Sequence, residues 1–108
     1  MSAHTLVTAV QVGETLSGVK AVAGTFTGSA SYDADGSVLD LSSVFSDEVR
    51  SIIALAQGAV GKVCHYVPAG SNAPATGELA VDDGGTQATA ADDLSGITFD
   101  FIAIGTDA

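Results

Sequence analysis

Acidic turns are the part of this sequence that most resembles a site with a chemistry of its own. Asp33 and Asp35 alternate within Asp-Ala-Asp-Gly, which is how carboxylates are spaced at the start of a calcium-binding loop. Such a loop closes with a distant bidentate Glu, and no Glu follows at the required distance. Two Asp-Asp pairs, 82–83 and 92–93, would bring four carboxylates together if their loops meet at one end of the fold. The metal candidates are therefore Asp33, Asp35, Asp82 and Asp83, and the simpler alternative is that these residues only build turns.

The softer metal ligands and the nucleophiles do not form a motif. Cys64 and His65 are neighbours in a predicted strand, where successive side chains point to opposite faces, so they neither chelate one zinc ion nor act as a dyad. The other histidine, His4, lies far away in the sequence. We expect a buried free thiol at position 64 and a half-exposed imidazole at position 65.

Motifs of the common enzyme classes are missing from the sequence. It contains no Gly-x-Ser-x-Gly, no phosphate-binding loop and no dinucleotide fingerprint. A sugar cleft is usually floored by aromatic rings, and the chain has only two Tyr, four Phe and no Trp. We predict that the protein is not an enzyme and uses no cofactor.

The charge is strongly negative, with 13 Asp and Glu against three Lys and Arg and a net charge of −10. This balance argues against binding to nucleic acid, whose phosphates need Lys and Arg, and against binding to an anionic membrane surface. Repulsion between like-charged surfaces, which keeps a protein soluble, is the simplest interpretation. A cationic partner, bound divalent ions and a salty habitat are the alternatives.

A length of 108 residues with 46% hydrophobic residues suits one domain that buries its own core. The single cysteine excludes an internal disulfide. The N-terminal residues do not resemble a secretory signal, and no apolar stretch is long enough to span a bilayer. We therefore expect one β-sandwich domain over residues 1–108, synthesised in a cytoplasm.

The hydrophobic pattern favours strands, because small and β-branched residues alternate between Gly-bearing turns. Residues 37–50 are the exception: Asp40 or Ser42 would cap one short helical turn there. With about seven to nine short strands and a turn about every 8–12 residues, the predicted fold is all-β, an antiparallel β-sandwich of jelly-roll-like type. Residues 1–14 would form an N-terminal arm or an edge strand. Strands are predicted over 4–13, 15–36 (as one strand or as two broken near Gly24 or Gly28), 49–58, 61–70, 78–81, 86–90 and 97–104.

The last strand is apolar on both sides. Phe99 and Phe101 share one face, whereas Ile102 and Ile104 have the opposite parity. A strand of this kind is either enclosed on both faces or meets another subunit. The strand around 49–58 is predicted to place Ile52, Ile53 and Leu55 inside. The predicted core or subunit seam comprises Ile52, Ile53, Leu55, Phe99, Phe101, Ile102 and Ile104.

Three segments, "GSVLDLSSVFSDEVRSIIAL", "GKVCHYVPAGSNAPATGELAV" and "ADDLSGITFDFIAIG", carry a resemblance to a known group. The chain from Gly36 to Gly105 resembles small virion proteins of tailed bacteriophages, of the capsid decoration (cement) type. The resemblance implies a jelly-roll-like or related sandwich that binds the outside of the assembled capsid and stabilises it. It implies two partners, the major capsid protein and further copies of the chain in a dimer or trimer, and it supplies no catalytic residues.

A position on the capsid exterior agrees with the charge, because packaged DNA would repel a chain of charge −10. Two alternatives remain open. The chain is another virion component, from the tail, the neck or a head-fibre base, or it is a carbohydrate-binding or adhesive β-sandwich module that uses calcium.

Overall fold

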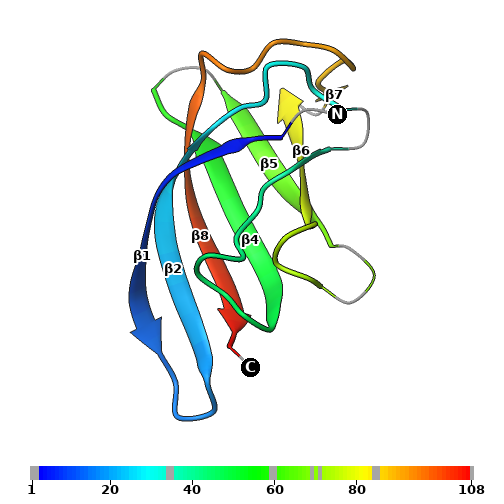
Figure 1. Cartoon of the computed structure of the whole chain (residues 1–108). Helices are drawn as coiled ribbons and strands as arrows, with labels where there is room; N and C mark the ends of the chain where they lie inside the picture. Colours follow the sequence, from blue (N-terminus) through cyan, green and yellow to red (C-terminus); the bar gives the residue numbers. More distant parts are fainter. Residues whose placement is uncertain are drawn as a thin grey trace.

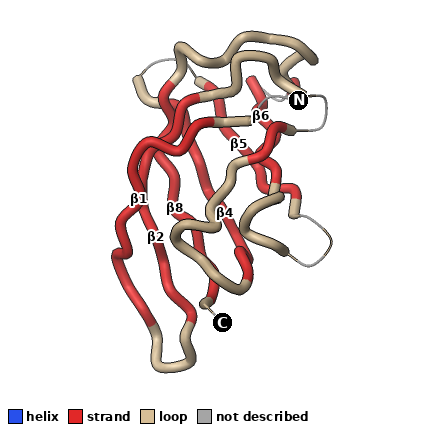
Figure 2. The backbone as a smooth tube through the Cα atoms, viewed as in Figure 1, coloured by secondary structure: helices blue, strands red, loops and turns tan. Residues whose placement is uncertain are grey.

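The computed structural model describes residues 3–33, 36–58, 61–68, 70, 72–83 and 86–107. In this part of the chain every regular element is a strand (Figure 2), which confirms the all-β class. The same residues contain no apolar helix long enough to cross a membrane. The strands are β1 (Thr5–Glu14), β2 (Val19–Thr27), β3 (Ser37–Val38), β4 (Glu48–Ala56), β5 (Lys62–Val67), β6 (Glu78–Asp83), β7 (Thr86–Gln87) and β8 (Thr98–Thr106).

The described strands form one sheet in the order β1-β2-β8-β4-β5-β6-β3, and β7 pairs with β6. Each neighbouring pair of strands is antiparallel. The C-terminal strand β8 lies in the interior of the sheet, between β2 and β4 (Figure 1). It pairs along its whole length with β2, from Val19 opposite Thr106 to Thr27 opposite Thr98. The sheet is therefore complete only when the end of the chain has been added.

The sheet is curled like half of a barrel. Its two edges, at β1 and β3, come together at one point. Ala3, just before β1, forms an isolated parallel bridge with Val38 of β3. The backbone N–H of His4 donates to the carbonyl oxygen of Val38 at 2.9 Å. The pairing between β4 and β5 is sparse for strands of their length, because they are in register at only two positions, Ala54 opposite Cys64 and Leu55 opposite Val63.

The inner face of the curled sheet carries the core. Phe26 of β2 and Phe99 of β8 stack with their ring centroids 4.9 Å apart, and the ring of Phe101 lies 5.9 Å from that of Phe26. Loop residues complete this core from the other side, since Tyr32, Leu39, Leu41, Phe45 and Leu94 are buried against it. The hydroxyl of Tyr32 accepts hydrogen bonds from the backbone N–H of Val81 and the side chain of Gln87, so its burial leaves no polar atom unpaired.

The predicted helical turn is present as a single turn before β4. The backbone N–H groups of Val44 and Phe45 both donate to the carbonyl oxygen of Leu41, at 3.0 Å. Asp40 caps this turn, because its Oδ1 accepts from the backbone N–H of Ser42 at 2.9 Å. The turn positions Phe45 in the core, where the Lys20 amino group lies 5.4 Å from its ring centroid.

Two residues expected in the interior are on the surface instead. Ile52 is buried as predicted, but Ile53 and Leu55 are 67% and 54% exposed. The prediction was wrong because successive residues in a strand point to opposite faces. Ile52 and Ala54 fill the inner face, and this forces their neighbours outward.

The strand boundaries differ from the prediction in several places. Of the described residues in the stretch 15–36, only Val19–Thr27 form a strand, which ends just before Gly28, and the two-residue strand Ser37–Val38 was not predicted. Residues 86–90 were predicted as a strand, and only Thr86 and Gln87 form one. Gly24 does not break the stretch 15–36, because β2 runs through it without a bulge; the register shifts lie in β1 instead. A Cβ at Gly24 would overlap the carbonyl oxygen of Thr8, which explains why a residue without a side chain is needed there.

Replacing Gly24 by Ala tests this close approach between β1 and β2. We expect Gly24→Ala to lower the free energy of unfolding by about 1–3 kcal/mol, because β1 must move away from β2. Gly13→Ala in the same strand pair is the control: a Cβ at Gly13 would meet no atom within 4 Å, so a change below about 0.5 kcal/mol is expected. Urea denaturation measures both variants, and equal effects would contradict the argument.

His4 connects the start of β1 to the loop after β2 and to strand β6 by hydrogen bonds. Its ring is buried and lies 5.2 Å from the ring of Phe26. The backbone N–H of Ser29 donates to Nδ1 at 3.1 Å, so Nε2 carries the proton and donates to the carbonyl oxygen of Leu79, also at 3.1 Å. Burial lowers the pKa of His4 from 6.5, outweighing its hydrogen bond to Leu79 and the charge of Asp33, because a protonated ring would lose its partner at Nδ1 and be a buried charge.

This lowered pKa predicts that acid destabilises the fold before the carboxylates titrate. Below pH 6.5 His4 is protonated in the unfolded chain but stays neutral in the folded chain. The free energy of unfolding therefore falls by up to about 1.4 kcal/mol per pH unit until the pH reaches the pKa of His4 in the folded chain. Denaturation at pH 7.5 and pH 5.5 measures the loss. A His65→Gln background leaves His4 as the one remaining histidine, and adding His4→Phe should flatten the profile at a lower overall stability. A loss that persists in the double variant would refute the assignment.

Candidate interaction surface

The outer face of the sheet exposes apolar side chains across five adjacent strands. Ile102 and Ile104 of β8 are 50% and 39% exposed, and Val63 of β5 is also exposed. We define the outer face by the side chains that share this side of the sheet: Val10, Ala21, Ala23, Ile53, Leu55, Val63, Ile102 and Ile104. Isolated apolar residues on a surface are ordinary, whereas a contiguous apolar patch of this kind usually marks a site of contact.

The strand register brings these residues together. Val10 is opposite Ala23, Ala23 is opposite Ile102, and Ile102 is opposite Ile53, so one row of apolar side chains crosses β1, β2, β8 and β4. Directly opposed side chains lie about 4.5–5.5 Å apart at Cβ. The double-sided apolar pattern of the last strand, visible in the sequence, therefore supplies the core on one side and this surface on the other.

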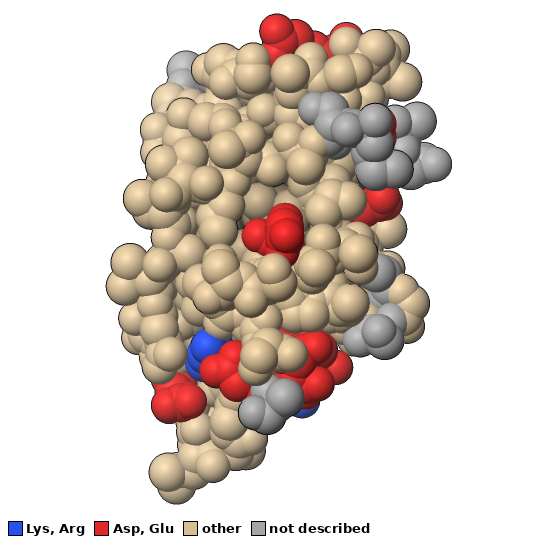
Figure 3. Space-filling model, viewed as in Figure 1, with Lys and Arg blue, Asp and Glu red and all other residues tan. Residues whose placement is uncertain are grey.

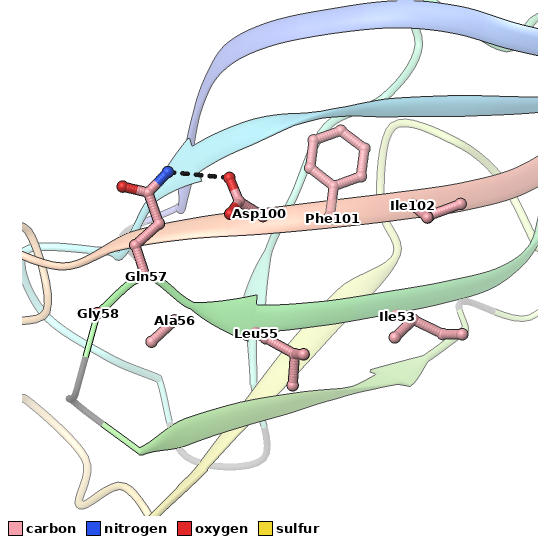
Figure 4. Close-up of a pocket in the computed structure, with 8 residues that line it drawn as sticks. All are labelled: Ile53, Leu55, Ala56, Gln57, Gly58, Asp100, Phe101 and Ile102. Atoms are coloured by element: carbon pink, nitrogen blue, oxygen red, sulfur yellow. Dashed lines mark hydrogen bonds between the residues drawn. The ribbon is translucent and has the colours of Figure 1, made fainter.

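The outer face is not flat. A shallow hollow of about 370 Å³ lies between β4 and β8. Ile53, Leu55 and Ile102 line it along the two strands, and Gly58 lies at its other end beside Gln57, as Figure 4 shows. At one end of this hollow the Gln57 side chain donates to Asp100 at 2.9 Å. A second hollow, of about 280 Å³, lies farther along the same face and is lined by Gly13, Glu14, Thr15, Val19, Lys20, Ala21 and Ile104.

The basic side chains are all engaged in ion pairs. Lys20 pairs with Asp107 at 2.6 Å, Arg50 with Glu48 at 2.8 Å and Lys62 with Asp83 at 3.0 Å; the chain has no other Lys or Arg. Exposed pairs of this kind add little stability, but they leave the surplus carboxylates to dominate the surface field. Figure 3 shows these carboxylates, with little basic surface in the same view.

The predicted metal candidates do not converge among the residues that the structure describes. The carboxylate of Asp82 accepts a hydrogen bond from His65 Nδ1 at 3.0 Å, whereas Asp83 pairs with Lys62. Asp33 lies at a turn in which its carbonyl oxygen accepts from Gly36. Within the described ranges no three His, Cys, Asp or Glu side chains are grouped closely enough to hold a metal ion, and Asp35 lies outside those ranges.

The second Asp-Asp pair builds turns. Asp92 accepts from the backbone N–H of Thr89 at 3.0 Å, and Asp93 accepts from both the backbone and the hydroxyl of Ser95. These two bonds lower the pKa of Asp93. Asp83 and Asp92 do share the wall of one small hollow, but the Lys62 side chain lies there as well.

Cys64 and His65 point to opposite sides of β5, as predicted. Cys64 packs against the core, and His65 is exposed and hydrogen-bonded to Asp82. Burial, and to a smaller extent the charge of Asp82, raises the pKa of the Cys64 thiol to about 12. A thiol with this pKa is a poor nucleophile and a poor metal ligand at neutral pH.

Sequence reasoning did not predict that further apolar residues, which lie outside the outer face as defined above, are exposed on the β1–β2 hairpin. This hairpin extends beyond the rest of the sheet (Figure 1), with Leu16 fully exposed at its tip. Val7 and Val12, which fall at the register shifts of β1, are exposed too. The signal that would have indicated this was the uncharged run from Thr5 to Gly13 in a strand that lies at the edge of the sheet.

No protein-family model, no curated protein and no solved structure matches this chain.

The thiol of Cys64 provides a direct test of the geometry of β5. With a pKa raised from 9.0 to about 12, the thiolate fraction at pH 8 is about a thousand times smaller than in the unfolded chain. Labelling with a disulfide reagent such as DTNB should be slower by about that factor in the native protein than in denaturant. Comparable rates in the two states would show that Cys64 is not held in the core.

Proposed function

We propose that this chain is a structural virion protein that binds the outer surface of an assembled phage capsid and stabilises it. The observation that carries the proposal is the outer face, where apolar side chains of five neighbouring strands are exposed together. Covering such side chains contributes about 25 cal/mol per Å² of apolar area removed from water. A protein that keeps them exposed gains this free energy when it meets its neighbours.

The chemistry of the hollows favours contact over catalysis. The polar side chains in the larger hollow, Asp100 and Gln57, are hydrogen-bonded to each other. A general acid–base pair needs a second titratable group placed on a substrate, and the thiol of Cys64 is suppressed by its high pKa. A protein without enzymatic activity, and without a cofactor, is the proposal that agrees with these residues.

The proposed partners are the major capsid protein and further copies of the chain, on the capsid exterior. The net charge of −10 supports the exterior position, because packaged DNA would repel the chain. Binding to the assembled lattice, and not to its looser states, stabilises the lattice by mass action. The resemblance of residues Gly36 to Gly105 to small virion proteins of tailed phages supports the same location and the same partners.

A jelly-roll-like sandwich is the finer fold assignment that accompanies this proposal. The sparse pairing between β4 and β5 divides the sheet into a part with β1, β2, β8 and β4 and a part with β5, β6 and β3. Two such parts facing each other across a shared core are how a sandwich is built. The isolated bridge between Ala3 and Val38 would then join the two layers at their open side.

The rival functions differ in what supports them. A tail, neck or head-fibre component would use the same apolar surface, so only the location of the protein in the particle separates it from a head protein. No observation favours a calcium-dependent carbohydrate-binding module, because Asp82 and Asp83 are engaged with His65 and Lys62.

Heads of the phage whose genome encodes the chain provide the test. Particles stripped with a chaotrope should regain the purified protein on mixing, co-sediment with it and withstand a higher temperature before they release DNA. Ile53→Asp, which places a charge on the outer face, should bind about tenfold less well or worse. Leu16→Asp, which places the same charge on the hairpin tip, is the matched control and should bind normally.

Immunoelectron microscopy with an antibody against the chain locates it on the same particles. Label on the outside of the head supports the proposal. Label confined to the tail or neck, or purified particles that lack the protein, would contradict it.

A further inference from the structure

We infer that the larger hollow of the outer face receives one basic side chain, a lysine or arginine of the capsid protein, whose charged end pairs with Asp100. The inference rests on the proposed function for the identity of the partner, and it deepens that function by naming the chemistry that the partner must present. The evidence comes from the position of Asp100, from its free carboxylate oxygen and from the shape of the hollow.

Asp100 lies in the middle of the outer face. The strand register places it opposite Thr25 of β2 on one side and opposite Leu55 of β4 on the other. The same row continues from Leu55 to Val63 of β5, and Ile102 follows two residues later on the same side of β8. A partner that covers Leu55 and Ile102 therefore also covers this carboxylate.

Covering the carboxylate of Asp100 is unfavourable unless the partner supplies a positive charge, because an ionised group loses its hydration when it is removed from water. The side chain of Gln57 donates to Oδ1 of Asp100 at 2.9 Å. Within the part of the chain that the structure describes, Oδ2 has no hydrogen-bond or ion-pair partner. One neutral hydrogen bond does not balance the charge, whereas a cationic donor at Oδ2 would.

The chain's own cations do not reach Asp100. Lys20, Arg50 and Lys62 are each paired with another carboxylate, and the sequence has no other Lys or Arg. A second copy of the chain would have to break one of these pairs to supply the charge, so a different protein is the better source. A divalent ion is not favoured, because it needs several ligands and the described residues contain no group of three His, Cys, Asp or Glu that could hold one.

The hollow has the composition of a site for a long basic side chain. Lys and Arg combine an apolar stem with a charged end. The hollow, of about 370 Å³, is lined by Ile53, Leu55 and Ile102 along the two strands, and Asp100 and Gln57 lie at one end of it (Figure 4). A stem that packs against the isoleucines would bring its charged end to the carboxylate.

Binding of Asp100→Asn to stripped heads tests the inference. The substitution removes the charge but keeps the size of the side chain and an oxygen that can accept from Gln57, so thermal melting of the free protein should be unchanged. We expect binding to be weaker by about tenfold or more, because the partner's cation loses its counter-charge. Raising NaCl from about 50 to about 500 mM should weaken the wild type more than Asp100→Asn.

Asp40→Asn is the matched control. It removes the same charge from the turn before β4, on the side of the sheet that carries the core, and keeps an oxygen that can accept from the backbone N–H of Ser42. It should bind like the wild type. Equal losses in the two variants would show that only the net charge matters, and would overturn the inference.

The sign of the effect at position 100 is decisive. If no cation meets Asp100, its carboxylate is an uncompensated charge in the interface, and Asp100→Asn should bind heads as tightly as the wild type or more tightly. That result would also overturn the inference.

Butylguanidinium chloride provides a test that needs no heads, because it joins an apolar stem to the charged group of arginine. Titrated into the purified protein, it should shift the amide NMR signals of Leu55 and Ile102 with a dissociation constant of about millimolar order. Asp100→Asn should weaken this binding by about tenfold or more, and Asp40→Asn should not. Signals that do not shift, or that shift equally in Asp100→Asn, would contradict the inference.

These results are separable from the test of the proposed function. Heads that bind the wild type and Asp100→Asn alike would remove the inference and leave the function standing. Heads that bind neither protein would remove the function, and the butylguanidinium titration would then decide whether the hollow receives a basic side chain.

Discussion

Insertion of the last strand between two earlier ones is the constraint on which this structure depends. β8 holds β2 on one side and β4 on the other, so the hairpin of β1 and β2 has no place in the sheet until residues 98–106 arrive. The same strand supplies Phe99 and Phe101, which pack with Phe26 in the core. Pairings this distant in sequence carry a high entropic cost and are expected to form late in folding.

The alternation of β8 then creates a protein with two apolar sides. The inner side is covered by the chain's own loops, with Tyr32, Leu41 and Phe45 buried against the sheet. The outer side has no cover of this kind among the described residues, and its exposed apolar side chains gain from contact. Solubility of the free chain and assembly with neighbours therefore rest on the same contrast between the acidic turns and a largely apolar face.

Sequence reasoning reached the all-β class, the antiparallel strands and the capped turn at Asp40, because these depend on residues close together in the chain. It recognised that Ile102 and Ile104 oppose Phe99 and Phe101, which is a property of strand alternation. It placed Ile53 and Leu55 inside because an apolar run does not reveal which face has a cover. It considered His4 only as a possible metal ligand. The hydrogen-bond partners of His4, Ser29 and Leu79, are brought to it by the curl of the sheet, which no local sequence pattern encodes.

Hydroxyl-radical footprinting of the protein, free and bound to stripped heads, tests the central claim, that one apolar side of the sheet is the core and the other is a contact surface. The account predicts that Phe99 and Phe101 stay protected throughout, whereas Ile53, Ile102 and Ile104 are oxidised in the free protein and become protected on the heads. Isoleucines that are protected in the free protein, or phenylalanines that react as readily as they do, would contradict it.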